Sequence, residues 1–572
     1  MIIVGINKSS HNASVVLMKD NDIIFHIESE RLSHVKYDRF PFSAMNKIKE
    51  YVDHVDIIAL AGLAESKQYD ELKLENVYKA FILGLHKTFN DNSKNIKTYD
   101  FGNQHHATHA AISFYNSGFD EALCVVKDGA GSVIKFESKE DPLNMVGRES
   151  SSFFTSRYPE KFLLIKQHIT TPHKLEKDQS IEWINNSVYE NNSFSEGTAF
   201  DMFAQNIGLT WADAGKIMGM SAYGKYGKTI PQIYKDDHIN KEIFSFDKIL
   251  DNWVFNYKEI DKNNFESSAN FAYALQTQIQ DHVAEEILNV LKQTNQKKLC
   301  LSGGFFLNCV SNYNLLKKLP KDVEIYVEPI ATDAGTAIGA AKLAYYLETQ
   351  SKEIKKQEHI YYGPKYNYTK NDLINEKIIE NITASDVAKI ISEKNIVAIY
   401  QGSSESGPRA LGNRSILYDP RDPNGKDHVN KVKNREWYRP FAGSVLKENA
   451  KEWFDLVSLD ESKFMMFAVD VLKDKKDLIP AITHVDGTCR VQTVAIEDNP
   501  NFYDLINEFY KITNVPVLFN TSFNLAGDTI VETLDDALWT LRNSDIMFLY
   551  LPELKVLVTN PTKHAIIDKI GG

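Results

Sequence analysis

The sequence predicts an α/β protein with two domains of unequal size. Its 572 residues exceed what one hydrophobic core usually holds, because single cores rarely grow beyond about 250–300 residues. Short apolar runs repeatedly end in loops rich in Gly, Asp and Ser, a pattern typical of strands in α/β folds. A charged stretch without apolar spacing, residues 345–358, interrupts this pattern and is interpreted as a linker. We therefore expect one domain over residues 1–350 and another over residues 359–572.

The expected strands of the first domain begin at the N-terminus. Apolar runs at 2–6, 13–18 and 23–27 are separated by polar turns and predict successive strands. Two further runs, 122–126 and 299–301, precede the loops KDGAGS and SGG. Asp333 is expected to cap a helix over 334–347, whose Gly and Ala residues predict close packing. Residues 133–290 are polar and irregularly patterned, so no element is assigned there.

The second domain shows another pattern of alternating helices and strands. A helix over 385–393 is followed by a strand over 396–400 and a loop rich in Gly and Arg. Further strands are expected near 464–471, 490–496, 515–519 and 554–558. A mixed domain of strands and helices is therefore expected after the linker.

Composition and charge limit the possible classes of function. With 43% hydrophobic and 25% charged residues, the chain is typical of soluble globular proteins. Its formal net charge of −12 argues against a broad face for duplex nucleic acid, which needs clustered cations. The cysteines are scattered without a CxxC pair, no secretory signal is recognised, and no apolar run of about eighteen residues occurs. We expect a cytoplasmic protein that neither spans a membrane nor binds large nucleic acids.

A group of histidines and aspartates predicts a metal site. His105 and His109, in QHHATHAAISFY, are four residues apart, so on a helix their side chains share one face. Asp128 follows the strand at 122–126, and Asp333 has a similar place in PIATDAGTAIG. Imidazole and carboxylate ligands with open positions suit Fe(II), Mn(II) or Zn(II). The alternatives are surface or capping histidines and ordinary turn or N-cap aspartates.

A series of segments between residue 5 and about residue 530 resembles one enzyme family. In the first half these are GINKSSHNAS, ESERLSHVKYDRFP, HHATHAAISFYNSGFD, KIMGMSAYG, LSGGFFLN and PIATDAGTAIGAA; in the second half they are ESGPRALGNRSILYDPRD, KVKNREWYRPFA, CRVQTV and PVLFNTSFN. With this ordered set the chain resembles the NodU/CmcH family of O-carbamoyltransferases, which carbamoylate hydroxyls of antibiotics and nodulation factors. It departs from the family where SAYG replaces the usual APYG and in the poorly matched middle region, which leaves the acceptor pocket unassigned.

The resemblance implies a fold and a reaction in two steps. The N-terminal domain is expected to be similar to actin-like ATPases and TsaD enzymes, and the C-terminal domain to be an α+β domain similar to YrdC. The C-terminal domain would join carbamoyl phosphate and ATP, with Mg²⁺, into carbamoyladenylate and release pyrophosphate. The N-terminal domain would then transfer the carbamoyl group to a hydroxyl at an iron site. The resemblance also implies a homodimer.

The resemblance also implies roles for residues of the first domain. His105, His109 and Asp128 match the family's metal ligands, and Asp333 matches its further acidic residue at the metal. His11 falls on the histidine expected to act as general base, which an alcohol nucleophile needs. The alternative for His11 is a hydrogen bond that only stabilises its loop.

Two groups of residues are expected to bind the nucleotide and the phosphates. Gly129, Gly303 and Gly304 would let backbone N–H groups approach a nucleotide, with Asn308 beside them, although Gly pairs are also ordinary turns. Neither a Walker A sequence nor GxGxxG is present. In the second domain several cations in one cleft would hold ATP and carbamoyl phosphate against their mutual repulsion. The expected ligands there are Arg409, Lys433, Arg439, Arg490, Ser522 and Asn524, with Arg414 and Arg435 as further candidates and a solvated surface as the alternative.

Two other classes of function fit parts of the sequence. An actin-like small-molecule kinase would release ADP without needing carbamoyl phosphate. A nucleotide-binding regulator would bind ATP without releasing pyrophosphate. The sequence leaves the acceptor open between a natural product, a sugar and a nucleotide.

Overall fold

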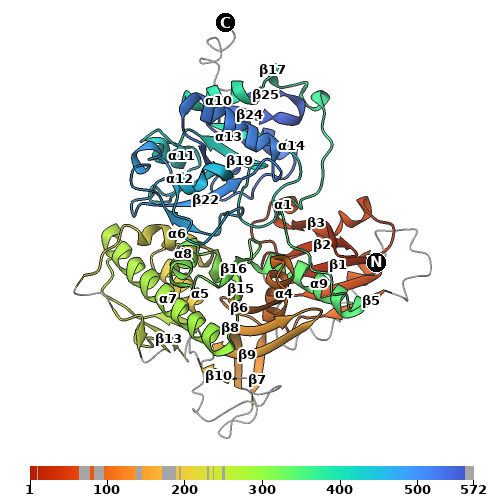
Figure 1. Ribbon diagram of the computed structural model, residues 1–572, viewed down its shortest axis with the longest axis vertical. Helices are drawn as coiled ribbons and strands as arrows, with labels where there is room; N and C mark the ends of the chain where they lie inside the picture. Colours follow the sequence, from red (N-terminus) through yellow and green to blue (C-terminus); the bar gives the residue numbers. More distant parts are fainter. Residues whose placement is uncertain are drawn as a thin grey trace. The chain divides into compact units, whose positions relative to one another are not determined.

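The computed structural model describes residues 1–9, 11–62, 78–82, 96–136, 145–170, 188–191, 195–227, 231–235, 238–247 and 252–560. The chain forms two compact units (Figure 1): unit 1 comprises Met1–Ser29 and Tyr37–Gln357, and unit 2 comprises Glu30–Lys36 and Glu358–Gly572. Helix α1 (Glu30–Ser33) therefore belongs to unit 2 although it lies near the start of the chain. Its buried Arg31 donates to the carbonyl oxygens of Glu405 and Gly407, which ties this segment to unit 2.

The first sheet of unit 1 has five strands in the order β3-β2-β1-β4-β5. These are β1 (Ile2–Asn7), β2 (Ser14–Lys19), β3 (Asp22–Glu28), β4 (Ile57–Ala61) and β5 (Lys97–Asp100). Strands β1, β2 and β3 pair antiparallel in succession, while β4 runs parallel to β1 and β5 parallel to β4. The successive strands predicted at the N-terminus are confirmed: the apolar runs of β1 and β2 are buried, and β3 is buried from Phe25 onward.

The second sheet of unit 1 repeats this arrangement. Strands β6 (Glu121–Lys127), β8 (Met145–Arg157) and β9 (Lys161–Thr170) pair antiparallel in succession. Strand β15 (Lys298–Ser302) runs parallel to β6, and β16 (Glu324–Val327) runs parallel to β15. At the edges, β10 (Val188–Asn191) pairs with β9, and β7 (Val133–Phe136) pairs with β8. Two sheets with the same order and directions are the arrangement expected of an actin-like domain, so the fold predicted for this half is confirmed.

Helices α4 (His105–Ser117) and α9 (Thr336–Thr349) lie between the two sheets and pack against each other (Figure 1). Helix α9 contacts β1, β2 and β4, whereas α4 contacts β6 and β15. Gly339 allows the close approach, since a Cβ there would lie 2.0 Å from the carbonyl oxygen of Thr108. The predicted tight packing of this helix is confirmed.

The expected role of Asp333 as the N-cap of this helix is wrong. Asp333 begins a 3-10 turn, Asp333–Gly335, and Gly335 occupies the N-cap position of α9 without a side-chain cap bond. The Asp333 carboxylate instead faces two histidines of α4, at 3.6 and 3.7 Å from their Nε2 atoms.

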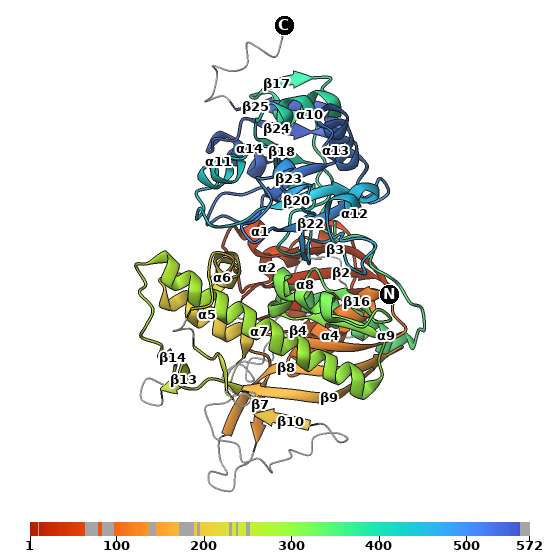
Figure 2. The same ribbon diagram turned by 60° about the vertical axis from the view of Figure 1, so that its left-hand side comes forward.

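Most of the other helices described in unit 1 lie in or beside the region where the sequence pattern assigned no element. They are α5 (Glu196–Asn206), α6 (Ala214–Ser221), α7 (Phe265–Thr294) and α8 (Cys309–Lys318), whereas the short helix α2 (Phe42–Met45) lies between β3 and β4. Helix α7 packs against both α6 and α8, as Figures 1 and 2 show. Two small hairpins join β11 (Tyr234–Lys235) to β12 (His238–Ile239) and β13 (Phe244–Asp247) to β14 (Asn252–Phe255).

Unit 2 is built on one nine-stranded mixed sheet, ordered β17-β25-β24-β18-β19-β23-β20-β22-β21. The strands are β17 (Lys377–Glu380), β18 (Val397–Tyr400), β19 (Arg414–Tyr418), β20 (Ala442–Leu446), β21 (Ala468–Asp470), β22 (Thr488–Val494), β23 (Val517–Ser522), β24 (Phe548–Leu551) and β25 (Val556–Thr559). Besides α1, its described helices are α10 (Ala384–Ser392), α11 (Gly425–Val432), α12 (Ala450–Trp453), α13 (Pro500–Thr513) and α14 (Leu534–Arg542). The mixed α/β organisation is confirmed, and the likeness to YrdC stays a prediction.

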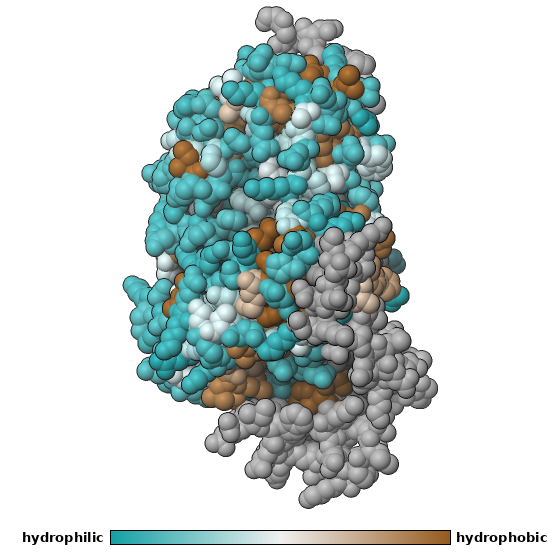
Figure 3. Space-filling model, turned by 90° about the vertical axis from the view of Figure 1, so that its right-hand side faces the viewer, coloured by the Kyte–Doolittle hydropathy of each residue, from teal (hydrophilic) through white to brown (hydrophobic). Residues whose placement is uncertain are grey.

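None of the described helices has an apolar stretch long enough to cross a membrane. The face drawn in Figure 3 is mostly hydrophilic, with its hydrophobic residues in separate patches. Helix α7 illustrates the usual division of a surface helix: Phe271, Leu275 and Ile279 are buried at four-residue spacing, whereas Glu285 is exposed.

Candidate active site

Helix α4 presents His105 and His109 on one face, as the four-residue spacing predicts. Both imidazoles are fully buried, with ring centroids 4.7 Å apart and planes at 86°. His106 follows His105 but turns away, and its Nδ1 lies 2.8 Å from Ser152 Oγ. The helical period therefore places His105 and His109 on one face of α4 and His106 on another.

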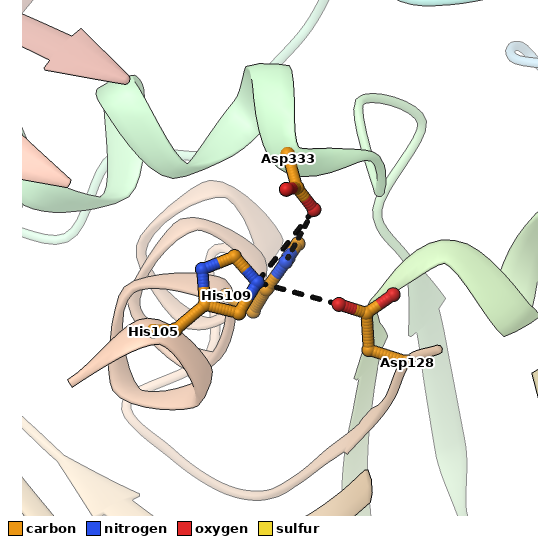
Figure 4. A group of neighbouring side chains, drawn as sticks. All are labelled: His105, His109, Asp128 and Asp333. Atoms are coloured by element: carbon orange, nitrogen blue, oxygen red, sulfur yellow. Dashed lines mark hydrogen bonds and ion pairs between the residues drawn. The ribbon is translucent and has the colours of Figure 1, made fainter. Parts of the chain in front are cut away.

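Two carboxylates complete the cluster. Asp128 directly follows β6, and Asp333 begins the turn before α9, so two further elements bring these carboxylates to α4 (Figure 4). His105 Nε2 lies 3.3 Å from an Asp128 oxygen and 3.6 Å from an Asp333 oxygen, and His109 Nε2 lies 3.7 Å from that same Asp333 oxygen. One ligand atom from each of the four residues lies within 4.8 Å of the others. We call this group the His–Asp cluster; it contains all four residues predicted to bind a metal.

The donor atoms of the His–Asp cluster fit a divalent cation. His109 Nδ1 lies 3.3 Å from Ser302 Oγ, which leaves its buried Nε2 facing the cluster without a hydrogen-bond partner among the described residues. One oxygen of Asp128 accepts from the Gly304 N–H at 3.4 Å, so the other oxygen is the one that faces His105. Two imidazole nitrogens and two carboxylate oxygens suit Fe(II), Mn(II) or Zn(II).

Opposite charges are concentrated in this buried cluster. Burial opposes a charge on His105, but the attraction of Asp333 and the hydrogen bond to Asp128 outweigh it and raise the pKa of His105 to about 10. Burial also opposes the charge of Asp333, yet His105 and then His109 hold the pKa of Asp333 well below its usual range. The Asp333 carboxylate therefore stays ionised, which is the state that binds a cation.

His11 lies in the loop between β1 and β2, outside the His–Asp cluster but close to it. Burial raises the pKa of Asp333, whereas His105 and His109 lower it. The charge of His11 lowers the pKa of Asp333 further. His11 Nδ1 lies 2.8 Å from Asn12 Oδ1, and the ring packs beside the indole of Trp211 with centroids 5.1 Å apart. The loop thus places the predicted base within electrostatic reach of Asp333.

The start of helix α5 holds the loop that follows Asp128. Ser195 Oγ and Thr198 Oγ1 both donate to the carbonyl oxygen of Gly129, at 2.9 and 3.0 Å. Ser195 is also the N-cap of α5, because its Oγ accepts from the Thr198 N–H. A serine before a helical run is a recognisable N-cap signal, but Ser195 and Thr198 lie in the region to which no element was assigned from the sequence.

Gly303, Gly304 and Asn308 follow β15 on the other side of Asp128. Gly303 has a φ of +96°, and a Cβ there would lie 2.2 Å from the carbonyl oxygen of Lys127. The Gly304 N–H is directed at Asp128, and the Asn308 side chain caps α8 by accepting from the Ser311 N–H at 3.0 Å. These contacts support the His–Asp cluster, and nucleotide binding by the three residues stays a prediction.

Replacing Gly303 with Ala is expected to destabilise unit 1 by at least about 2 kcal/mol, because such a backbone costs other residues about 1–3 kcal/mol and the methyl group would overlap Lys127. The change is measured as a lower midpoint of thermal unfolding. Gly129→Ala is the matched control, since no atom lies within 4 Å of a Cβ at that position. Equal midpoints for the two variants would contradict the assignment of Gly303.

In unit 2, Lys433 follows α11 and is buried. Its Nζ donates to the carbonyl oxygen of Ser522 and, at 2.8 and 2.9 Å, to the carbonyl oxygen and Oδ1 of Asn524. An ammonium has three N–H donors, so the loop after β23 uses all of them. Burial, followed by the charges of Arg435 and Arg439, holds the pKa of Lys433 well below its usual range. The structure thus brings the predicted ligands Lys433, Ser522 and Asn524 together.

Three arginines add like charge around Lys433. Burial lowers the pKa of the Arg435 guanidinium, and the charges of Arg439 and Arg490 lower it further. The effect of Glu436, which raises this pKa, is smaller. Arg435 Nη1 lies 3.5 Å from Thr521 Oγ1, and Arg439 Nη1 lies 3.3 Å from a Glu436 oxygen. We call Lys433, Arg435, Arg439 and Arg490 the cationic cluster. Its positive potential suits a phosphate-bearing ligand.

Two other predicted arginines have different surroundings. The buried Arg414 donates to the carbonyl oxygens of Gln401, Asn413 and Glu532 and lies 3.8 Å from the centre of the Tyr400 ring. These contacts assign Arg414 to the stability of unit 2. Arg409 is half-buried in the loop before β19, and its binding of ATP or carbamoyl phosphate stays a prediction.

Two family models match the chain. The model described as Carbamoyltransferase N-terminus matches residues 51–342, and the one described as Carbamoyltransferase C-terminus matches residues 388–557. The chain therefore belongs to the carbamoyltransferase family.

Individual relatives agree with this assignment. Nodulation protein NolNO of Sinorhizobium fredii is 30% identical over 94% of this chain and 78% of its own length. Nodulation protein NolO of Bradyrhizobium diazoefficiens is 32% identical over 77% of this chain and 76% of its own length. An uncharacterised protein of Methanocaldococcus jannaschii is 32% identical over 90% of this chain and 84% of its own length. The predicted family resemblance is confirmed.

Solved structures resemble the chain only distantly. HypF from T. kodakarensis aligns over 62% of this chain and 48% of its own, with 15% identity and a TM-score of 0.36. A similarity at this level carries no argument about the site.

Proposed function

We propose that the protein is an ATP-dependent O-carbamoyltransferase acting in two steps, one in each unit. The observation that carries the proposal is the buried His–Asp cluster in a chain of the carbamoyltransferase family. The cationic cluster of unit 2 supports the assignment of a separate step to that unit. The acceptor is a small molecule with a hydroxyl group.

The first step is assigned to unit 2. Overall, carbamoyl phosphate, ATP and water give carbamoyladenylate, phosphate and pyrophosphate. Both substrates are polyanions, and the cationic cluster lowers the repulsion between them, because arginine forks bind phosphate bidentately. Ser522 and Asn524, at the end of β23, accept the hydrogen bonds that position Lys433 in the cationic cluster.

The second step is assigned to unit 1. His11 accepts the proton of the acceptor hydroxyl while the alcohol oxygen forms its bond to the carbamoyl carbon and AMP leaves. When bound by His105, His109, Asp128 and Asp333, a divalent metal such as Fe(II) supplies a Lewis acid for the charge that develops on the carbamoyl group. Burial of the cluster excludes water from this place, which protects the activated carbamoyl group from hydrolysis.

Product analysis tests the proposed function. The protein is incubated anaerobically with carbamoyl phosphate, ATP, Mg²⁺ and Fe(II), together with a panel of hydroxylated compounds. We expect pyrophosphate, AMP and a carbamoyl mass gain on an acceptor, each requiring carbamoyl phosphate. Release of ADP without carbamoyl phosphate would support the kinase, and ATP binding without pyrophosphate release would support the regulator.

Replacing His11 with Asn is expected to leave carbamoyladenylate formation intact and to slow transfer by about 10²–10⁴-fold, the usual contribution of a general base. Because asparagine cannot take up a proton at neutral pH, the variant should lose the transfer step and keep carbamoyladenylate formation. The two steps are followed as pyrophosphate release and as carbamoylated acceptor. His54→Asn, at an exposed histidine of unit 1, is the control. Unimpaired transfer by the His11 variant would remove this role.

A further inference from the structure

The His11 ring is held by a chain of hydrogen bonds that its role as a base does not by itself require. His11 Nδ1 lies 2.8 Å from Asn12 Oδ1, and Asn12 Nδ2 donates to a Glu28 oxygen at 3.3 Å. Glu28 is buried at the end of β3, so the chain of bonds ends on a carboxylate fixed in the first sheet of unit 1.

These contacts determine which nitrogen of His11 carries the proton. An ionised carboxylate only accepts hydrogen bonds, so the Asn12 amide must direct its NH₂ group at Glu28. The amide oxygen then faces His11, and because it also only accepts, His11 Nδ1 must donate. In the neutral ring the lone pair is consequently on Nε2, the nitrogen that is free to take up a proton.

The backbone around Asn12 supports this orientation. Asn12 has a φ of +54°, a left-handed conformation that Asn tolerates better than most residues. Asn7 Nδ2 donates to the Asn12 carbonyl oxygen at 2.9 Å, and Asn7 Oδ1 accepts from the Ser9 N–H at 3.1 Å. Neither bond uses the Asn12 side chain, so the Asn12 amide is available to His11 and Glu28.

The indole of Trp211 restricts the ring from a second direction. Its centroid lies 5.1 Å from that of His11, and a capping box between Thr210 and Asp213 fixes the turn that carries Trp211. Tyr37, another residue of unit 1, packs on the indole with centroids 5.2 Å apart. Rotation of the His11 ring out of its bond to Asn12 is therefore opposed by packing.

We infer that Asn12 is a positioning residue, oriented by Glu28, that holds His11 with Nδ1 protonated and Nε2 ready to accept the proton of the acceptor hydroxyl. This inference rests on the proposed role of His11. In the transfer step the hydroxyl proton moves to Nε2, the oxygen bonds to the carbamoyl carbon, and the bond from that carbon to the AMP oxygen breaks. The Nδ1 proton stays in its bond to Asn12. Because an amide is neutral, Asn12 orients the ring without supplying a negative charge, unlike the aspartate of a serine-protease triad.

Nitrogen NMR of the full-length protein tests this tautomer without an acceptor. The protein is labelled with ring-¹⁵N histidine, and the His11 signals are assigned as those missing from His11→Asn. In the neutral ring of the wild type we expect Nδ1 at the position of a protonated nitrogen and Nε2 at that of an unprotonated one. The reverse pattern, or an even mixture, would overturn the inference.

Two variants of Asn12 connect the tautomer to the reaction. Asn12→Gly suits the φ of +54° and removes the hydrogen-bond acceptor, so we expect mixed tautomers and transfer slower by about 10–100-fold, the scale seen when a partner that orients a histidine is lost. Asn12→Asp keeps an acceptor and should retain the Nδ1-protonated ring. Pyrophosphate release should be unchanged in both.

The outcomes separate this inference from the proposed function. A wild-type tautomer in Asn12→Gly, or transfer at the wild-type rate, would overturn the role of Asn12 while leaving His11 as the base. If His11→Asn transfers normally, the proposed function of His11 fails whatever the tautomer.

Discussion

Asp333→Asn is expected to abolish carbamoyl transfer while carbamoyladenylate still forms. One Asp333 oxygen lies 3.6 Å from His105 Nε2 and 3.7 Å from His109 Nε2, so this carboxylate joins both histidines of the cluster. Asparagine has the same shape but no charge, and a neutral amide binds a divalent transition-metal cation more weakly than a carboxylate does. We expect transfer to fall by at least about 10²-fold, more than the loss of an outer-shell partner costs.

Measurement of the two steps in parallel distinguishes this loss from misfolding. Pyrophosphate release reports on unit 2, the carbamoylated acceptor reports on unit 1, and thermal unfolding reports on the fold. Asp281→Asn is the matched control, because Asp281 pairs with Lys318 on the surface of unit 1. A loss of both steps together, or normal transfer by the Asp333 variant, would contradict the assignment of the cluster.

Lys433→Met is expected to stop carbamoyladenylate formation, the step that the Asp333 variant should retain. Methionine fills a similar volume but cannot donate to the carbonyl oxygen of Asn524, whereas the Ser522 carbonyl oxygen still accepts from the Asn524 N–H. The variant also removes the Lys433 amine from the cationic cluster. We expect ATP–pyrophosphate exchange to fall by at least about 10²-fold, in line with the loss of a preorganised electrostatic contact.

A stability effect must be separated from this catalytic effect. A typical hydrogen bond stabilises the fold by about 0.5–1.5 kcal/mol, so unit 2, which loses those donated by Lys433, should also unfold at a lower temperature. Exchange is therefore measured well below the unfolding midpoint of the variant. Lys431→Met, an exposed lysine of α11, is the control and should keep the wild-type rate. Unchanged exchange in the Lys433 variant would refute its assignment.

Local spacing explains why the His–Asp cluster could be predicted from the sequence. His105 and His109 share a face because of the helical period, and Asp128 could be recognised because it ends an apolar strand. The role of Asp333 was predicted correctly as a neighbour of these residues but wrongly as a helix cap. A carboxylate before a helix satisfies both patterns, and only its position in space decides between them.

Contacts between distant segments could not be predicted in the same way. Asn12 and Glu28 are joined across a hairpin, and Ser195 and Thr198 reach Gly129 from a region without a periodic pattern. The repeat of strand order in the two sheets of unit 1 is likewise absent from the sequence, because equal topology does not require similar residues. Membership of α1 in unit 2 depends on Arg31, whose partners lie more than 370 residues away.

The occupancy of the His–Asp cluster by metal tests the central claim most directly. The wild type and the Asp333→Asn variant are reconstituted anaerobically in separate samples with Fe(II), Mn(II) or Zn(II), freed of unbound ions, and analysed for metal per chain. We expect the wild type to retain about one ion per chain and the variant to lose most of it, since the site has one set of four ligands. No retained metal in the wild type, or equal retention in both proteins, would contradict a metal centre at these residues.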